Sequence, residues 1–188
     1  NDLETAHKVI ETDLIINNLR DKIVKYLSSI FPVETVTEHQ SVTISGLMHV
    51  VSDIEHIGDN CKDIANFAVD KIAKGYSFSD SACAEIYQCF DHSSKMVSDS
   101  IEALNTGNTL LARHVKEQQE EMADMEEHLR EKHMRRLNKK QCSPEFSVVY
   151  TDIVNDLKKI GDNCDNIANA VLKDINFRAI KDDGEKHS

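Results

Sequence analysis

The sequence predicts an all-α protein built from long helices, and three observations support this fold class. The 188 residues include only two prolines and six glycines, the residues that most often interrupt helices. Apolar residues recur at alternating steps of three and four, as they do along the buried seam of a helix bundle. The pattern I-G-D-N-C-x-x-I-A-N occurs twice, at 57–66 and 160–169. The chain therefore contains an internal helical repeat.

The first two predicted helices span 3–31 and 36–74. Val9, Ile10, Ile16, Ile23 and Leu27 form an apolar stripe along the first helix, which Pro32 closes because the residue before a proline disfavours helical geometry. The second helix ends at Gly75, since glycine readily adopts the left-handed conformation of a C-cap. These signals predict two long consecutive helices.

Three further helices are predicted over 79–106, 109–140 and 144–177. Ser79 or Asp80 caps the third helix, which ends at Gly107, and Asn108 caps the fourth. Ser143 with Pro144 just inside is typical of the start of the fifth. The polar residues 178–188 are predicted to form a disordered tail.

Composition excludes several classes of function. A net charge of −11 argues against nucleic-acid binding, because phosphates would repel such a surface. No apolar run approaches the roughly 18 residues that span a bilayer, and no phosphate loop or nucleophile elbow indicates an enzyme. Five cysteines without a C-x-x-C pair favour a reducing cytoplasm. The chain begins at Asn1 rather than Met, which suggests that it was cut from a longer protein.

The two motif copies lie 103 residues apart, and ten of the twenty positions in 53–72 match 156–175. The seam positions agree as well. They are Ile44, Leu47, Val51, Ile54, Gly58, Cys61, Ala65, Ala68 and Ile72 in the first copy, and Ser147, Tyr150, Val154, Leu157, Gly161, Cys164, Ala168, Val171 and Ile175 in the second.

Small residues of the motif are predicted to have a packing role. Gly58 and Gly161 lie on the seam, where a missing side chain lets another backbone approach, at a cost of about 1 kcal/mol in helix propensity. Cys61 and Cys164 follow one turn later and are predicted to be small buried apolar side chains.

Polar residues of the motif are predicted to lie off the core face. These are Asp59, Asn60 and Asn66 with their counterparts Asp162, Asn163 and Asn169, and Glu55, Asp59 and Asp63 form a ridge at i, i+4 and i+8. Three interpretations are open: a solvated ridge, contacts that fix helix register, or a metal site for a hard cation or iron.

The segment E-H-I-G-D-N-C-K-D-I-A-N resembles the signature of the PhoU family, which carries it once in each of two three-helix bundles. Residues 130–169, with R-x-x-H-x-x-R-L and C-S-P-E, resemble the PhoU-like region at the cytoplasmic C-terminus of bacterial sodium/phosphate cotransporters. The resemblance implies a pair of antiparallel up-down bundles. Residues 1–75 would form the first, lacking its initial helix before Leu3, and 79–177 the second. The open groove would favour a homodimer or capture of an upstream helix.

In the PhoU family, E-x-x-x-D residues can hold metal, including iron clusters. The resemblance therefore implies a possible divalent metal or iron site at Glu55 and Asp59, faced by Asp13 with Asn17 beyond, and with Asp63 adding charge. The second copy has Lys158 before Asp162, and an ammonium group cannot ligate a cation. Lys158 is instead expected to neutralise Asp162 or Asp165 directly.

A basic cluster ends the fourth predicted helix. It could complement the helix C-terminus, contact an anionic membrane surface or the transporter, or bind phosphate. Its members are Arg130, Lys132, Arg135, Arg136, Lys139 and Lys140.

The resemblance implies a regulatory domain on the cytoplasmic side of a sodium-dependent phosphate transporter, with the transporter's membrane part on the same polypeptide. The alternatives are a free-standing PhoU-like regulator of a separate transporter or kinase, and a metal-storing or redox bundle.

Overall fold

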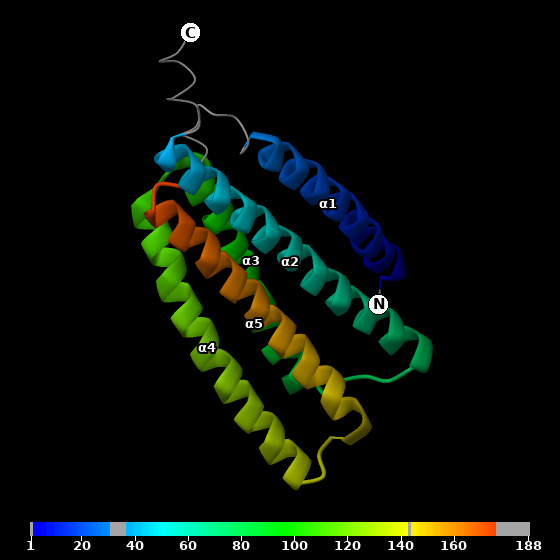
Figure 1. Cartoon of the computed structure of the whole chain (residues 1–188). Coiled ribbons are helices and arrows are strands. Elements are labelled where there is room, and N and C mark those ends of the chain that lie inside the picture. Colours follow the sequence, from blue (N-terminus) through cyan, green and yellow to red (C-terminus); the bar gives the residue numbers. More distant parts are fainter. Residues whose placement is uncertain (1, 31–36, 143, 176–188) are drawn as a thin grey trace.

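The computed structural model describes residues 2–30, 37–142 and 144–175, and every regular element in them is an α-helix. The helices are α1 (Leu3–Ile30), α2 (Glu38–Lys74), α3 (Asp80–Thr106), α4 (Thr109–Asn138) and α5 (Pro144–Leu172). Consecutive helices run in opposite directions (Figure 1). The predicted all-α class and the five helices are confirmed.

Helix α5 is the centre of the molecule. It packs against α3 and α4 to form a three-helix bundle, and its other side packs against α2. Among the described helices α1 contacts α2 alone, and it lies at the outer edge of the molecule (Figure 1). The pair α1–α2 and the pair α4–α5 therefore correspond to each other, while α3 has no counterpart beside α1 and α2 in the described chain.

Local sequence signals account for most helix boundaries. Thr37 caps α2 in a capping box with Gln40, and Gly75 ends that helix in the left-handed conformation with φ of 68°. Gly107 ends α3 in the same way, and the Asn108 side chain accepts two backbone N–H groups at the start of α4. Pro32 and Ser143, which were predicted to close and cap helices, lie outside the described residues, as does the tail 178–188.

Two helices end earlier than predicted. Helix α4 stops at Asn138, and α5 stops at Leu172 rather than at Phe177. Asp174 adopts a positive φ of 62°, and the Ile175 N–H donates to the Ala170 carbonyl at 3.0 Å. This closing turn directs Ile175 onto α2, where it packs with Leu27, Ile44 and Leu47 in a small second core.

The predicted seam is buried along α5 but only partly along α2. From Tyr150 to Ile175 every seam position of α5 is buried, whereas Val51, Ile54 and Cys61 of α2 are half-buried and Ala68 is exposed. This difference in burial follows from helix packing, because three helices pack against α5 and two pack against α2. The main core accordingly lies among α3, α4 and α5.

Candidate functional site

The first ridge consists of Asp13 from α1 with Glu55, Asp59 and Lys62 from α2. Lys62 Nζ donates to Asp13 Oδ2 at 3.0 Å and also hydrogen-bonds Asp59 Oδ1. Asn17 Nδ2 donates to the same Asp13 oxygen at 3.0 Å. Asp13 is only 3% exposed, so this ion pair links α1 to α2 below the surface. The hydrogen bonds to Asp59 and Asp13 raise the pKa of Lys62, which keeps the ammonium charged.

Glu55 is buried but has no close hydrogen-bonded partner among the described residues. Its nearest possible partners are the Arg20 guanidinium, with Nη2 3.9 Å from Glu55 Oε1, and the His56 ring, with Nε2 3.6 Å from Glu55 Oε2. Glu55 Oε2 and Asp13 Oδ1 are both buried acceptors without a hydrogen bond. Such orphaned oxygens are costly in a folded protein.

The second ridge consists of Lys116 and Gln119 from α4 with Lys158, Asp162 and Asp165 from α5. Lys158 Nζ donates to Asp162 Oδ2 at 2.6 Å, and Gln119 Nε2 donates to Asp162 Oδ1 at 2.7 Å. Lys116 Nζ donates to Asp165 Oδ1 at 3.0 Å and to Asn169 Oδ1 at 2.9 Å. Every carboxylate of this ridge therefore has a cation beside it.

The ion pairs between helices in the two ridges occupy equivalent positions with opposite polarity. Adding the repeat offset of 103 to Asp13 gives Lys116, and adding it to Lys62 gives Asp165. The acid stands on the first helix of one pair and on the second helix of the other, yet both ion pairs span 3.0 Å. The position is kept while the charges are exchanged, which favours the interpretation that these contacts fix helix register.

Both motif copies also line a shallow pocket of about 380 Å³ between α2 and α5. Its walls are His56, Asp59, Asn60, Lys159, Asp162 and Asn163. These six residues form three pairs, each separated by the repeat offset, so the pocket lies where the two repeats meet with local twofold symmetry.

The PhoU domain model matches residues 1–68 and 86–171, which together cover both motif copies and all five helices. The chain belongs to the PhoU domain family. A PhoU relative, the phosphate-specific transport system accessory protein PhoU homolog 1 of Thermotoga maritima, is 25% identical over 167 residues, covering 89% of this chain and 71% of the relative.

Two solved structures have the same fold. The crystal structure of PhoU from Pseudomonas aeruginosa matches with a TM-score of 0.85 and 21% identity, covering 91% of this chain and 81% of that one. The phosphate transport system regulatory protein PhoU from Streptococcus pneumoniae matches with a TM-score of 0.76 and 20% identity, covering 91% and 79%. The PhoU-like fold is therefore confirmed.

The metal that the PhoU resemblance implies does not fit the ridges in the arrangement described here. A cation placed between Asp13 and Asp59 would meet the Lys62 ammonium, and one at Asp162 would meet Lys158. Among the described residues, no group of three or more His, Cys, Asp or Glu side chains is arranged to hold a metal ion. We derive no chemistry through a metal here.

Two motif positions differ from the sequence prediction. Asn60 was placed off the core but is buried, because its side chain turns back and donates to the His56 carbonyl at 2.6 Å. Asn163 makes the equivalent bond to the Lys159 carbonyl at 2.8 Å. Asp63 is exposed, and Lys159 of α5 lies within reach of its charge, so Asp63 lies toward the other repeat.

The motif glycines and cysteines are packing residues, with one correction. A side chain on Gly58 would meet Ile16 and one on Gly161 would meet Met122 and Met96, so neighbouring side chains rather than a backbone fill these positions. Cys164 is fully buried and Cys61 is half-buried against the core. Burial raises the pKa of both thiols, to about 12 for Cys164, which keeps them protonated and unreactive.

The basic cluster at the end of α4 is largely paired within the chain. Arg130 Nε donates to Glu126 at 2.9 Å, and Arg135 Nη2 donates to Glu131 at 3.0 Å. Lys139 and Lys140 are exposed at the helix end. Arg130 and Arg135 stay on the surface, with 63% and 70% of their side chains exposed, so these ion pairs leave both residues accessible to a partner.

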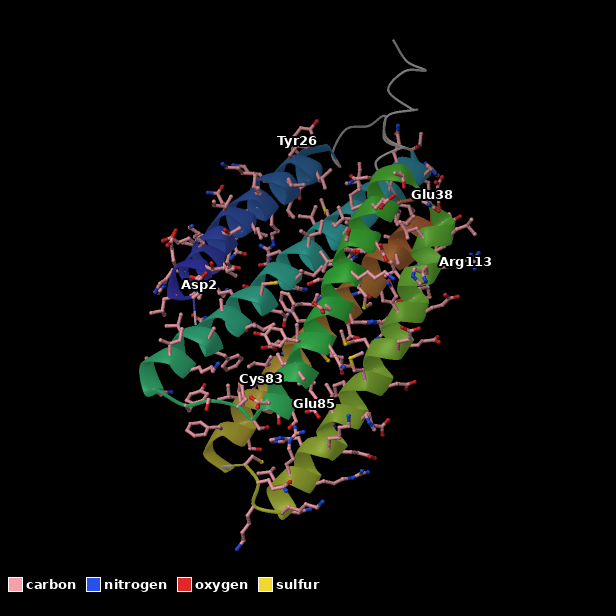
Figure 2. The ribbon with its side chains drawn as sticks, turned by 180° about the vertical axis from the view of Figure 1, so that it is seen from behind. Asp2, Tyr26, Glu38, Cys83, Glu85 and Arg113 are labelled. Carbon is pink, nitrogen blue, oxygen red and sulfur yellow. The ribbon has the colours of Figure 1, made fainter. Side chains whose placement is uncertain are left out.

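Arg136 was predicted to be a surface cation, and that is wrong. Only 14% of its side chain is exposed, since Nη1 lies 2.8 Å from Glu85 Oε2 of α3 and the guanidinium covers the Tyr150 ring of α5 at 5.2 Å. Tyr150 Oη also donates to Glu85 at 2.7 Å, and burial followed by this bond raises the tyrosine pKa. Glu85, at the start of α3 (Figure 2), thus joins all three helices of the bundle.

Sequence reasoning missed Glu85 and His133 as members of this buried network. His133 Nε2 lies 2.7 Å from Ser147 Oγ, and its ring stacks on Tyr150 with centroids 4.5 Å apart. The R-x-x-H-x-x-R-L pattern could have indicated this network. His133 and Arg136 are three positions apart in it and therefore share one face of α4.

Proposed function

We propose that this PhoU domain regulates phosphate transport by binding to a phosphate transporter. The observation that carries the proposal is the family match over both repeats, together with a relative described as an accessory protein of a phosphate-specific transport system. The site contributes charged surfaces and ion pairs but no arrangement of nucleophile and base, which favours a binding role over catalysis.

We infer that the transporter is a separate protein rather than part of the same polypeptide. The Thermotoga maritima and Streptococcus pneumoniae relatives are PhoU proteins, described as an accessory and a regulatory protein of phosphate transport systems. Attachment to a sodium-dependent cotransporter remains a prediction. None of the described helices is long and apolar enough to cross a membrane. We place the domain at the cytoplasmic face of the plasma membrane, where a transporter presents its loops.

The face that carries the α2–α5 pocket is the best candidate for that contact. Asp59 and Asp162 are about two-fifths exposed there, at 41% and 40% of their side chains, beside the exposed His56 and Lys159. Alternating acidic and cationic groups on one face suit a partner loop of mixed charge, because complementary charges give specificity.

Phosphate uptake by cells tests the proposal. We expect deletion of the domain to change how uptake responds to external phosphate, and the double variant D59A/D162A to reproduce much of that change. Asp70→Ala is the matched control, since Asp70 is an exposed acid on α2 that also pairs with a lysine one turn away. Unchanged uptake and unchanged phosphate response in the deletion strain would contradict the regulatory role.

A further inference from the structure

The two ridges have positively charged side chains where the PhoU resemblance implies a metal. Lys62 reaches two carboxylates in the first ridge, and Lys116 and Lys158 each reach one in the second. A lysine ammonium is a compact point charge on a flexible stem, so it can occupy the space between carboxylates much as a small cation would.

The ridges differ in how completely their charges are balanced. In the second ridge Asp162 and Asp165 face two lysines, and Gln119 and Asn169 complete the hydrogen bonding. In the first ridge Asp13 and Asp59 share the single ammonium of Lys62, which leaves one net negative charge. Glu55 lies 3.9 Å from Arg20, a cation that also pairs with Asp21 at 2.7 Å.

Of the two ridges, only the first has carboxylate oxygens that are buried without a hydrogen bond in the described chain. Asp13 is 3% exposed and Glu55 is 9% exposed, and each keeps one buried oxygen without a donor. No acid of the second ridge has such an atom among the described residues. The first ridge therefore has unused oxygen donors, which are the ligand type that hard divalent cations prefer.

We propose that Lys62 is a built-in cation that takes the place of a divalent metal, so that this PhoU domain folds without metal, and that removing the Lys62 charge lets a divalent cation bind between Asp13 and Asp59. The second ridge stays closed to metal when Lys158 alone is removed, because Lys116 and Gln119 remain on its carboxylates. The inference concerns the charge balance of the domain and does not depend on its regulatory role.

The variant Lys62→Met tests this, because methionine keeps the length of the side chain and removes the charge. With Lys62 gone, Asp13 and Asp59 lose the cation that bridges them, and their double negative charge matches a divalent cation. We expect calorimetric titration with Mn²⁺ to give about one ion per chain in K62M and no saturable binding in the wild type. The melting temperature of K62M should rise with Mn²⁺ and fall with EDTA, while that of the wild type should respond to neither.

Lys158→Met is the matched control and should bind Mn²⁺ at least about tenfold more weakly than K62M. Lys62→Gln serves if K62M does not fold, since glutamine can still donate to Asp13. Wild-type protein that is purified without chelator and holds stoichiometric metal would overturn the proposal, as would a folded K62M or K62Q that binds no Mn²⁺. Phosphate uptake is not part of this readout, so its outcome can differ from that of the regulatory test.

Discussion

Three glycines lie inside helices of the described chain, and their missing side chains make room for different neighbours. A Cβ on Gly46 would lie 2.1 Å from Ile175 Cδ1 and 2.9 Å from its Cγ1. A Cβ on Gly161 would lie 3.4 Å from the flexible Met96 and Met122, an ordinary contact. Gly46, which the sequence motif does not include, is therefore the glycine at which an added side chain is least tolerated, and Gly58 follows because its Cβ would lie 3.1 Å from Ile16 Cδ1.

We expect Gly46→Ala and Gly161→Ala to have opposite effects on stability. The first forces Ile175 out of its place against Leu27, Ile44 and Leu47, and such overpacking typically costs about 1–3 kcal/mol. The second adds a methyl group that methionines can accommodate and gains up to about 1 kcal/mol in helix propensity. Urea unfolding curves measure both changes, and equal destabilisation by the two variants would contradict this account.

His133 gives the stability of the second bundle a dependence on pH. Burial, and then the nearby Arg136 charge, lower the pKa of His133 below its usual 6.5. The unfolded chain therefore takes up a proton at a higher pH than the folded chain does. The stabilising contribution is complete above pH 6.5 and is lost as the pH falls below that value.

Replacing His133 with glutamine should flatten this dependence. In the wild type we expect the unfolding free energy to fall below pH 6.5 by at most about 1.4 kcal/mol for each pH unit on account of this group. In H133Q that part of the slope should disappear, whereas His114→Gln, at an exposed position of the same helix, should keep it. Unfolding midpoints measured between pH 7 and pH 5 test this prediction. Equal slopes of stability against pH in the wild type and H133Q would refute the assignment to His133.

At the scale of helices, ion pairs of exchanged polarity hold α1 on α2 and α4 on α5. The helix propensities of the single residues do not distinguish these ion pairs from other charged residues on the surface. Their significance appears only when Asp13 is aligned with Lys116 and Lys62 with Asp165. Asp13 is buried, so changing its partner leaves an uncompensated buried charge, which typically costs about 3–5 kcal/mol. Lys116 and Asp165 are 41% and 25% exposed, so breaking their pair costs less.

The exchange of charge predicts the result of a double-mutant cycle at Asp13 and Lys62. Asp13→Lys alone places two lysines together at a buried position and should destabilise the domain by about 3 kcal/mol. The double variant D13K/K62D restores an ion pair with the polarity found between Lys116 and Asp165, and should recover at least half of that loss. Chemical unfolding of the four proteins gives the coupling energy, and a coupling near zero would show that this pair does not fix register.

Helix positions and caps could be predicted from local sequence, whereas the partners of charged residues could not. Two contacts are exceptions: the PhoU resemblance placed Asp13 opposite the first ridge, and Lys158 was expected to neutralise Asp162 or Asp165, and the structure shows Asp13 bonded to Lys62 and Lys158 bonded to Asp162. Arg136 was placed wrongly because a run of basic residues is typical of a solvated helix end. Its guanidinium is buried because it bonds to Glu85, which lies 51 residues earlier in the sequence. Such contacts depend on helix packing, which local periodicity does not contain.

At the scale of the whole molecule, the repeat leaves one face of α1 without a packed helix among the described residues. Gln118, Met122, Glu126 and Leu129 of α4 are each at most 8% exposed, and Gln118 donates to Asp99 of α3 at 3.0 Å. Subtracting the repeat offset gives the α1 residues Ile15, Leu19, Ile23 and Tyr26, which are 61%, 51%, 41% and 68% exposed. The side chain of Tyr26 points outward at the end of α1 (Figure 2).

This apolar stripe on α1 is the surface through which we expect the chain to form a homodimer. Apolar contact between helices drives association in water, and α3 shows that the equivalent face of α4 accepts a helix. Leu19→Asp places a charge in the middle of the stripe. In sedimentation equilibrium we expect wild-type dimers, and we expect this variant to raise the Kd of dimerisation at least about tenfold.

Leu110→Asp, at a leucine 78% exposed on α4, is the matched control and should leave association unchanged. A wild type that stays monomeric at high concentration would contradict dimerisation through α1, and equal weakening by both variants would place the interface elsewhere.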